Sequence, residues 1–241
     1  MLNSADIKKI RSLRDKKFRD ELGLFTAEGE KICAEALAAS SADGRFEVLE
    51  HYTTEQIGQK TMERISALSS PSPELCVIRK PGDLYSMPQH LKKDGLYLAL
   101  DVIRDPGNMG TILRIADWFG LDGVFAAPDS VDIFNPKVVQ STMGAIFRVD
   151  FHYCSIAELC SRNDAEVFGT FLEGENIYEA ELSSDRARII VTGNESNGIS
   201  DSVSKACTRR LTIPSFAKGQ GSESLNAAVA TAITVSEFKR R

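Results

Sequence analysis

Three separated segments of the sequence place polar side chains at points where an apolar strand should end. In the first, DVIRDPGNMGTILRIADWFG (residues 101–120), a strand runs into a Pro-Gly-Asn-x-Gly turn that leads into a helix. Asn108 could cap this helix, or it could face a ligand together with the free N–H groups of the first turn. Arg114 has mostly apolar helical neighbours, so its guanidinium needs a partner or an interface. We keep two interpretations of Arg114: a buried salt bridge to Asp117 or Asp105, and an anion-binding catalytic residue.

The second segment, RIIVTGNESNGISDSV (188–203), follows another apolar strand. Its glycines and polar residues are Thr192, Gly193, Asn194, Glu195 and Gly198. Such residues populate many turns, so this segment is weak evidence by itself. In parallel α/β folds, however, ligands collect in the loops at the carboxyl ends of strands. In such a loop Glu195 could accept hydrogen bonds from backbone N–H groups.

The third segment, IPSFAKGQGSESLNAAVATAI (213–233), joins a strand to the C-terminal helix. Either Ser224 or Asn226 could cap that helix. A cap explains one polar residue, whereas two precede an almost wholly apolar helix whose alanines allow close packing. Capping alone therefore does not account for this segment.

The elements that must hold these segments fall into two regions. From residue 95 onward, strands that are apolar throughout alternate with helices, which favours a parallel sheet covered on both faces. Residues 1 to about 90 are typical of a compact mixed unit, with strands expected at 46–52 and 74–80 and helices around them. The Pro, Gly and Asp residues of 79–95 predict a linker between the two regions.

The composition is that of a soluble globular protein, with 42% apolar and 26% charged residues in 241. The net charge of −5 gives no global reason to expect a nucleic-acid partner, although a local basic patch would suffice for one. The five cysteines include no CxxC pair and the three histidines lie far apart, so we expect neither a metal site nor disulfides. Without a signal peptide or an apolar run long enough to span a bilayer, we expect a cytoplasmic protein that does not bind membranes.

Taken together, the three segments resemble the motifs of the SpoU (TrmH) family of S-adenosylmethionine-dependent RNA 2′-O-ribose methyltransferases, in the SPOUT superfamily. The first is similar to the motif Asn-x5-Arg, as Asn108 and Arg114, and the second to Gly-x-Glu-x-x-Gly, starting at Gly193. The third is similar to Ile-Pro followed by Ser-Leu-Asn, where the nine residues 215–223 make a longer loop than the family usually has. A stretch near the N-terminus, KKFRDELGLFTAEGEKICAEAL, resembles the L30e-like substrate-binding domain that many members carry.

The resemblance implies an α/β fold: a SPOUT-type parallel sheet with a C-terminal trefoil knot over 95–241, and a small N-terminal α+β (L30e-like) RNA-binding domain over 1–90. It implies S-adenosylmethionine as the cofactor, no metal, and a homodimer. The cofactor-binding residues implied are Thr192, Gly193, Asn194, Glu195, Gly198, Ile213, Pro214 and Leu225. The catalytic residues implied are Arg114, Asn108, Ser224 and Asn226. Arg114 would take the proton of the ribose hydroxyl or organise the charge around it, and the three others would orient it and the substrate.

Positive charge is concentrated near the N-terminus, and a solvated helix face is the simplest explanation for it. The resemblance favours phosphate contacts instead, which need no base specificity. The candidate RNA-binding residues are Arg14, Lys16, Lys17, Arg19 and Lys137. An L30e-like domain suits structured ribosomal RNA, so large-subunit rRNA is the first expected substrate and tRNA the second.

Two other classes of function compete with the enzyme. A non-catalytic RNA-binding or ribosome-assembly factor of the same fold is disfavoured because a degenerate site should have lost at least one of its polar residues. These are Asn108, Arg114, Glu195, Ser224 and Asn226, and all are present. A nucleotide-binding oxidoreductase would share the parallel α/β organisation, but the sequence has no GxGxxG fingerprint at the expected place.

Overall fold

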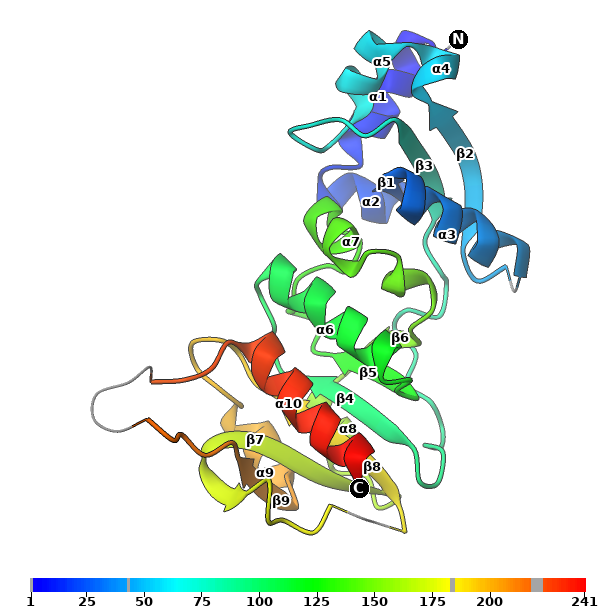
Figure 1. Ribbon diagram of the computed structural model, residues 1–241. Helices are drawn as coiled ribbons and strands as arrows, with labels where there is room; N and C mark the ends of the chain where they lie inside the picture. The colour runs from blue at the N-terminus through cyan, green and yellow to red at the C-terminus, as the bar shows by residue number, and fades with distance from the viewer. Residues whose placement is uncertain (1, 43, 183–184, 218–222) are drawn as a thin grey trace. The chain divides into compact units, whose positions relative to one another are not determined.

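The apolar strands expected from residue 95 onward form a single six-stranded sheet in the computed structural model, which describes residues 2–42, 44–182, 185–217 and 223–241 (Figure 1). All strand pairs in this sheet are parallel, in the order β6-β5-β4-β8-β7-β9. The strands are β4 (Leu96–Leu100), β5 (Gly123–Ala126), β6 (Phe151–Tyr153), β7 (Ala165–Asn176), β8 (Ala187–Thr192) and β9 (Arg209–Thr212). The predicted parallel sheet is therefore confirmed.

Helices cover both faces of this sheet, because side chains that alternate along each strand point to opposite faces. On one face, Ala99 and Val191 share a core with α8 (Ile156–Cys160) and α9 (Asp201–Ala206). On the other face Phe168 of β7 packs edge-on against Phe238 of the C-terminal helix α10 (Ala227–Arg240), with ring centroids 4.9 Å apart. Helix α6 (Pro106–Trp118) lies beside α10 (Figure 1). The first and third polar segments, which begin these two helices, are thus held side by side.

The chain forms two compact units, and the sheet belongs to the second, Asp83–Val131 with Val149–Arg241. The first unit contains Met1–Gly82 and Asp132–Arg148. Its antiparallel sheet has the order β1-β3-β2, from β1 (Leu24–Glu28), β2 (Glu47–Thr53) and β3 (Glu74–Arg79). Its helices are α1 (Ser4–Ser12), α2 (Lys16–Leu22), α3 (Glu30–Ala42), α4 (Thr54–Ile57), α5 (Gln59–Ile65), α7 (Pro136–Thr142) and a 3₁₀ turn, η1 (Ala145–Phe147). Among the described residues no helix is long and apolar enough to cross a bilayer.

Strand β1 was not expected from the sequence, because its residues LFTAE form neither a continuous apolar run nor a strict alternation of apolar and polar side chains. All five of its residues are buried. It pairs with β3 along its whole length, from Leu24 opposite Arg79 to Glu28 opposite Leu75. The trefoil knot that the family resemblance implies stays a prediction, as do the domain ranges 1–90 and 95–241.

Residues 132–148 pack in the first unit although they lie within the range 95–241. A cluster of aromatic rings joins them to it: the ring of Phe25 in β1 lies 4.5 Å from that of Phe134, and the ring of Phe46 lies 5.2 Å from that of Phe147. Aromatic side chains bury large apolar areas, so such a cluster anchors the segment firmly. The segment between β5 and β6 is thus an integral part of the first unit's core.

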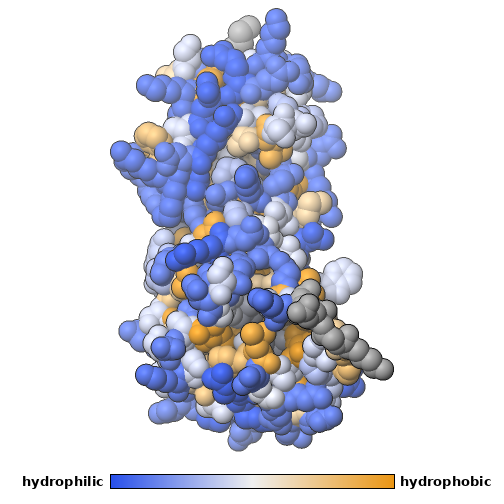
Figure 2. All heavy atoms as spheres, turned by 90° about the vertical axis from the view of Figure 1, so that its left-hand side faces the viewer, coloured by the Kyte–Doolittle hydropathy of each residue, from blue (hydrophilic) through white to orange (hydrophobic). Residues whose placement is uncertain are grey.

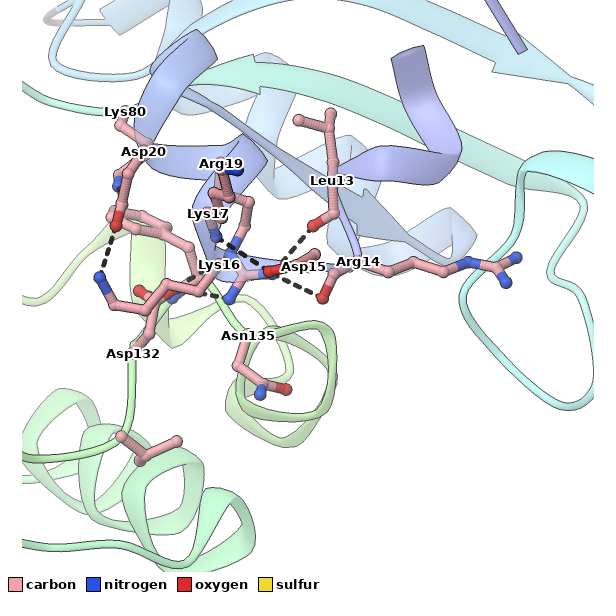
Figure 3. A network of polar contacts seen from close by, with 12 residues as sticks. Leu13, Arg14, Asp15, Lys16, Lys17, Arg19, Asp20, Lys80, Asp132 and Asn135 are labelled. Carbon is pink, nitrogen blue, oxygen red and sulfur yellow. Dashed lines mark hydrogen bonds and ion pairs between the residues drawn. The ribbon is translucent and has the colours of Figure 1, made fainter. Parts of the chain in front are cut away.

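A buried ion pair reinforces this anchor (Figure 3). The Arg19 guanidinium donates from Nε and Nη2 to Oδ2 of Asp132, at 2.9 and 2.6 Å, and from Nη1 to the carbonyls of Leu13 and Arg14, both at 2.9 Å. Arg19 is only 2% exposed. The expectation that Arg19 contacts RNA is therefore corrected: its donors are used inside the protein, and a phosphate could not reach them.

Breaking this pair should destabilise the first unit. In Asp132→Asn the buried Arg19 charge keeps its position but loses its counter-charge, which for buried pairs costs about 3–5 kcal/mol. We expect a loss of that order in the free energy of unfolding, measured by urea denaturation. As a control, Glu47→Gln removes the exposed ion pair with Arg79 and should cost at most about 1 kcal/mol. Equal losses in the two variants would contradict the structural role of Arg19.

Candidate active site

Helix α6 is capped by Asp105, which leaves Asn108 available for other contacts. Oδ1 of Asp105 accepts a hydrogen bond from the backbone N–H of Asn108 at 2.8 Å, and Pro106 occupies the first helical position. The interpretation of Asn108 as the cap is therefore wrong. An aspartate followed by proline is a strong helix-start signal, so the sequence could have identified Asp105.

The side-chain amide of Asn108 links all three polar segments. Its Nδ2 donates to Oε1 of Glu195 at 3.0 Å, and its Oδ1 accepts from Nδ2 of Asn226 at 2.9 Å. Asn108 is 8% exposed, so this amide has both of its ends satisfied in a nearly buried position. Glu195 follows Asn108 by 87 residues in the sequence, and Asn226 follows it by 118, yet the fold brings the three together.

Asn226 has two roles at the start of α10. Its Oδ1 accepts from the backbone N–H groups of Ala228 and Val229, at 3.0 and 3.2 Å, which makes it the helix cap. Its Nδ2 is then free to bind Asn108. Ser224, two residues earlier, is exposed. The structure thus assigns the cap to Asn226 and leaves Ser224 facing solvent, while residues 218–222 of the lengthened loop lie outside the described residues.

Glu195 supports the loop that precedes α6. Its carboxylate accepts from the backbone N–H groups of Arg104 and Asp105, at 3.4 and 3.3 Å, as well as from the amide of Asn108. The prediction that Glu195 accepts hydrogen bonds from backbone N–H groups is confirmed. The partners belong to the first polar segment, so Glu195 acts here by fixing that loop.

The remainder of the second segment is a tight turn whose glycines are required by geometry. Asn194 and Gly198 exchange two backbone hydrogen bonds of 2.9 Å, and Gly198 has a φ of +67°. A Cβ on Gly193 would lie 2.3 Å from the carbonyl carbon of Gly198, a distance that no side chain can tolerate. Asn194 also donates to the carbonyl of Val102 at 2.8 Å, which ties this turn to the first segment.

The other expected cofactor residues lie around this cluster. Thr192 is buried, and its hydroxyl lies 2.9 Å from that of Thr231 in α10, so its side chain holds β8 to that helix. Ile213 and Pro214 are half-buried, and Leu225 is 49% exposed. The side chain of Thr192 is therefore unavailable to a ligand, whereas the side chain of Leu225 is accessible.

Arg114 is not brought to the Asn108 cluster. It follows Asn108 by six residues, so the helical period of 3.6 places its side chain about 120° away around α6. It is exposed and makes no hydrogen bond or ion pair with any described residue. The interpretation of Arg114 as half of a buried salt bridge is therefore wrong. One turn later Trp118 is 86% exposed, which gives this face of α6 a cation beside a bare aromatic ring.

Two features of the site had no signal in the sequence. Asp101 is a buried carboxylate that accepts from the backbone N–H of Ser200 at 2.6 Å. Val102, the next residue, has a φ of +63°, which is rare for a β-branched side chain. Such strain is typical of functional loops held by their surroundings.

Cys154 and Cys160 are buried thiols of low reactivity. Burial raises the pKa of the Cys154 thiol to about 11 and that of Cys160 to about 12, so both stay protonated at neutral pH. In the part of the chain that the structure describes, no three His, Cys, Asp or Glu side chains are grouped so that they could hold a metal ion. The chemistry of this cluster rests on amides, hydroxyls, one carboxylate and backbone groups.

Glu195→Ala should loosen the loop before α6, because the amides of Arg104 and Asp105 lose their acceptor. We expect faster hydrogen–deuterium exchange at these two amides, and a smaller effect in Glu195→Gln, which keeps an acceptor oxygen. Glu173→Ala, which removes an exposed carboxylate of β7, is the matched control and should leave both amides unchanged. Unaltered exchange in Glu195→Ala would show that Glu195 does not hold this loop.

Comparisons with known proteins show the family to which the chain belongs. Residues 95–236 match the model of the SpoU rRNA methylase family, and residues 4–73 match an MRM3-like substrate-binding domain. A structure of the TrmH family from Porphyromonas gingivalis is 36% identical with a TM-score of 0.84 over 100% of this chain and 99% of its own. An AdoMet-bound rRNA methyltransferase from Sinorhizobium meliloti is 27% identical with a TM-score of 0.85, over 100% and 96%. The 23S rRNA (guanosine(2553)-2′-O)-methyltransferase RlmP of Bacillus subtilis is 26% identical over 95% of this chain and 94% of its own. The chain belongs to the SpoU rRNA methylase family.

Proposed function

We propose that this protein transfers a methyl group from S-adenosylmethionine to a ribose 2′-hydroxyl of large-subunit ribosomal RNA. The observation that carries the proposal is the Asn108 amide, which joins the three motif segments of the family into one polar cluster with Glu195 and Asn226. Membership of the SpoU rRNA methylase family supports the reaction. The relative from Bacillus subtilis, which acts on 23S rRNA, supports rRNA over tRNA as the substrate.

The loops around this cluster fit the cofactor. Large apolar side chains are exposed there: Leu172, Phe216 and Leu225. Leu172 and the 213–214 loop are neighbours, because Oγ1 of Thr212 donates to the Leu172 carbonyl at 3.0 Å. Figure 2, which views the molecule from the side of these loops, shows hydrophobic atoms gathered at the surface of the second unit. Apolar side chains beside backbone donors and acceptors suit an adenine ring and a thioether chain, and need no metal.

S-adenosylmethionine, when bound, supplies an electrophilic sulfonium methyl group. The protein must bring a ribose oxygen into line with it and stabilise the charge that develops as the O–H proton leaves. We assign the catalytic contacts with the ribose and its phosphate to Arg114, whose guanidinium is exposed and uncommitted. A guanidinium is permanently charged and carries five donors, so it can hold a phosphate and polarise a hydroxyl at the same time. We place Ser224, also exposed, beside the same substrate.

We further propose that the protein is a homodimer. Arg114 does not face the polar cluster of its own chain, so a second copy is needed to complete the site. The support is that Trp118, one helical turn from Arg114, is 86% exposed, and that Val229 on the adjacent helix α10 is 49% exposed. Large apolar side chains left bare on a surface can mark a protein interface.

The RNA grip proposed for the first unit consists of exposed lysines. Lys16 and Lys17 pair with Asp20 and Glu21 on the same helix, at 2.5 and 3.9 Å. Exposed pairs of this kind contribute little, so a phosphate can replace the carboxylate. Lys137 is also exposed, whereas Arg14 already donates to the carbonyl of Ser66.

We propose the cytoplasm as the compartment of this protein. Its cysteines are free thiols, and a reducing environment would keep them so.

Arg114→Ala should abolish catalysis without abolishing cofactor binding. We expect methyl transfer from labelled S-adenosylmethionine to large-subunit rRNA to fall by at least about 100-fold, the size of effect seen when one charge-stabilising group is removed. Calorimetry without added metal should give nearly the same cofactor affinity as the unaltered protein. Arg64→Ala, an exposed arginine of α5, is the control. Full activity in Arg114→Ala would refute its role; failure of the unaltered protein to bind S-adenosylmethionine would refute the enzyme itself.

The double variant Lys16→Glu/Lys17→Glu should weaken RNA binding by removing two phosphate contacts. The slope of log affinity against log salt should become shallower by about 1.5–2, because RNA binding releases fewer counterions when two phosphate contacts are missing. Lys60→Glu/Arg64→Glu makes the same change in net charge on exposed residues of α5 and should leave the slope unchanged. Equal weakening by both doubles would mean that total charge alone, and no defined site on α2, governs binding.

A further inference from the structure

A surface hollow in the first unit has no role in the site described above. It has a volume of about 310 Å³, at the lower end of the range for ligand pockets. Its walls come from three segments that are distant in the sequence: residues 29–32, 72–73 and 140–143. All three lie in the first unit, so the hollow is formed within one compact body.

The walls of the hollow are held firmly in place. Gly29, between β1 and α3, has a φ of +112°, and a Cβ there would lie 3.8 Å from the hydroxyl of Ser72. Helix α7, which provides Gln140, is fixed by the buried side chains of Val138 and Val139. Met143 ends that helix with a φ of +52° and remains 42% exposed. A bulky non-glycine residue in this conformation is unusual, and here it directs a flexible apolar side chain to the rim.

The polar side chains of the hollow are not used by the protein itself. Lys31, Ser72 and Gln140 make no side-chain hydrogen bond or ion pair with any described residue. Together they offer an ammonium donor, a hydroxyl and an amide that both donates and accepts. Beside them stand the apolar surfaces of Pro73 and Met143.

We propose that this hollow binds one unstacked nucleotide of the substrate RNA. Proteins read single-stranded RNA by packing a splayed-out base against side chains and bonding its edge. Gln140 and Ser72 would bond the edge of the base, with Pro73 and Met143 against its faces. Lys31 would hold the phosphate. Glu30 also lines the hollow, and its negative charge disfavours a bare anion there, so a neutral base fits the interior better than a phosphate does.

This inference rests on the proposed function only in taking RNA as the partner. The hollow would then recognise one base of the RNA, whereas the lysines of α2 would contribute affinity that does not depend on the RNA sequence. The two kinds of contact differ in their dependence on salt, because an uncharged contact releases no counterions.

The test compares Gln140→Leu and Lys31→Ala in binding to an in vitro transcript of large-subunit rRNA. Gln140→Leu should lower the affinity at least about fivefold with an unchanged salt slope, as expected for a lost base contact. Lys31→Ala should lower the affinity and reduce the slope by about 1. Both should raise the KM for RNA while leaving the affinity for S-adenosylmethionine unchanged. Two controls should match the unaltered protein: Ser141→Ala, whose hydroxyl bonds its own helix at the Lys137 carbonyl, and Gln59→Leu on α5.

The outcomes separate this inference from the proposed function. Unaltered RNA affinity in Gln140→Leu would overturn the nucleotide site while leaving the enzyme intact. If Gln140→Leu loses thermal stability, the salt slope of RNA binding by Lys31→Ala tests the nucleotide site instead. An unchanged slope in Lys31→Ala would overturn the nucleotide site. If AMP binds the unaltered protein but not Gln140→Leu, and RNA affinity is equal in both, the hollow takes free nucleotides and the RNA proposal fails. If the unaltered protein binds no rRNA at all, the proposed substrate itself is wrong.

Discussion

The arrangement of the second unit depends on one side-chain amide. Asn108 is almost buried, and such a group must satisfy its donor and its acceptor or pay a large desolvation cost. It does so with Glu195 on one side and Asn226 on the other. Each of these partners has a local task, Glu195 at the loop before α6 and Asn226 at the start of α10. Because one amide serves both, the three loops cannot shift independently.

This constraint gives several polar residues of the motifs a task within the protein itself. Asn108 joins the side chains of Glu195 and Asn226, and Glu195 positions the backbone before α6. Thr192 fastens β8 to α10 through Thr231. Arg114 and Ser224 are exposed, and they are the two motif residues that we propose to meet RNA. Glu195 and Asn226 are exposed as well, but their side chains are held by hydrogen bonds to Asn108.

The sequence predicted much of this, and its failures have physical reasons. Apolar strands alternating with helices indicated the parallel sheet, because buried strands need no polar face. Strand β1 gave no such signal, because Thr26 and Glu28 interrupt its apolar residues although both are buried. Arg19 was grouped with exposed cations because charge is visible in a sequence whereas a counter-charge 113 residues away is not. The sequence left a cap as one of two interpretations of Asn108, and Asp105, three residues earlier, fills that role in the structure.

The return of residues 132–148 to the first unit affects how the chain can fold during synthesis. The boundary between the units is crossed at three places, after residues 82, 131 and 148. Residues up to 82 are synthesised before residues 132–148, so Phe25 and Arg19 at first lack Phe134 and Asp132. A nascent first unit therefore exposes part of its aromatic core until β4 and β5 have been made. The first unit can be completed only after residue 148 has been translated.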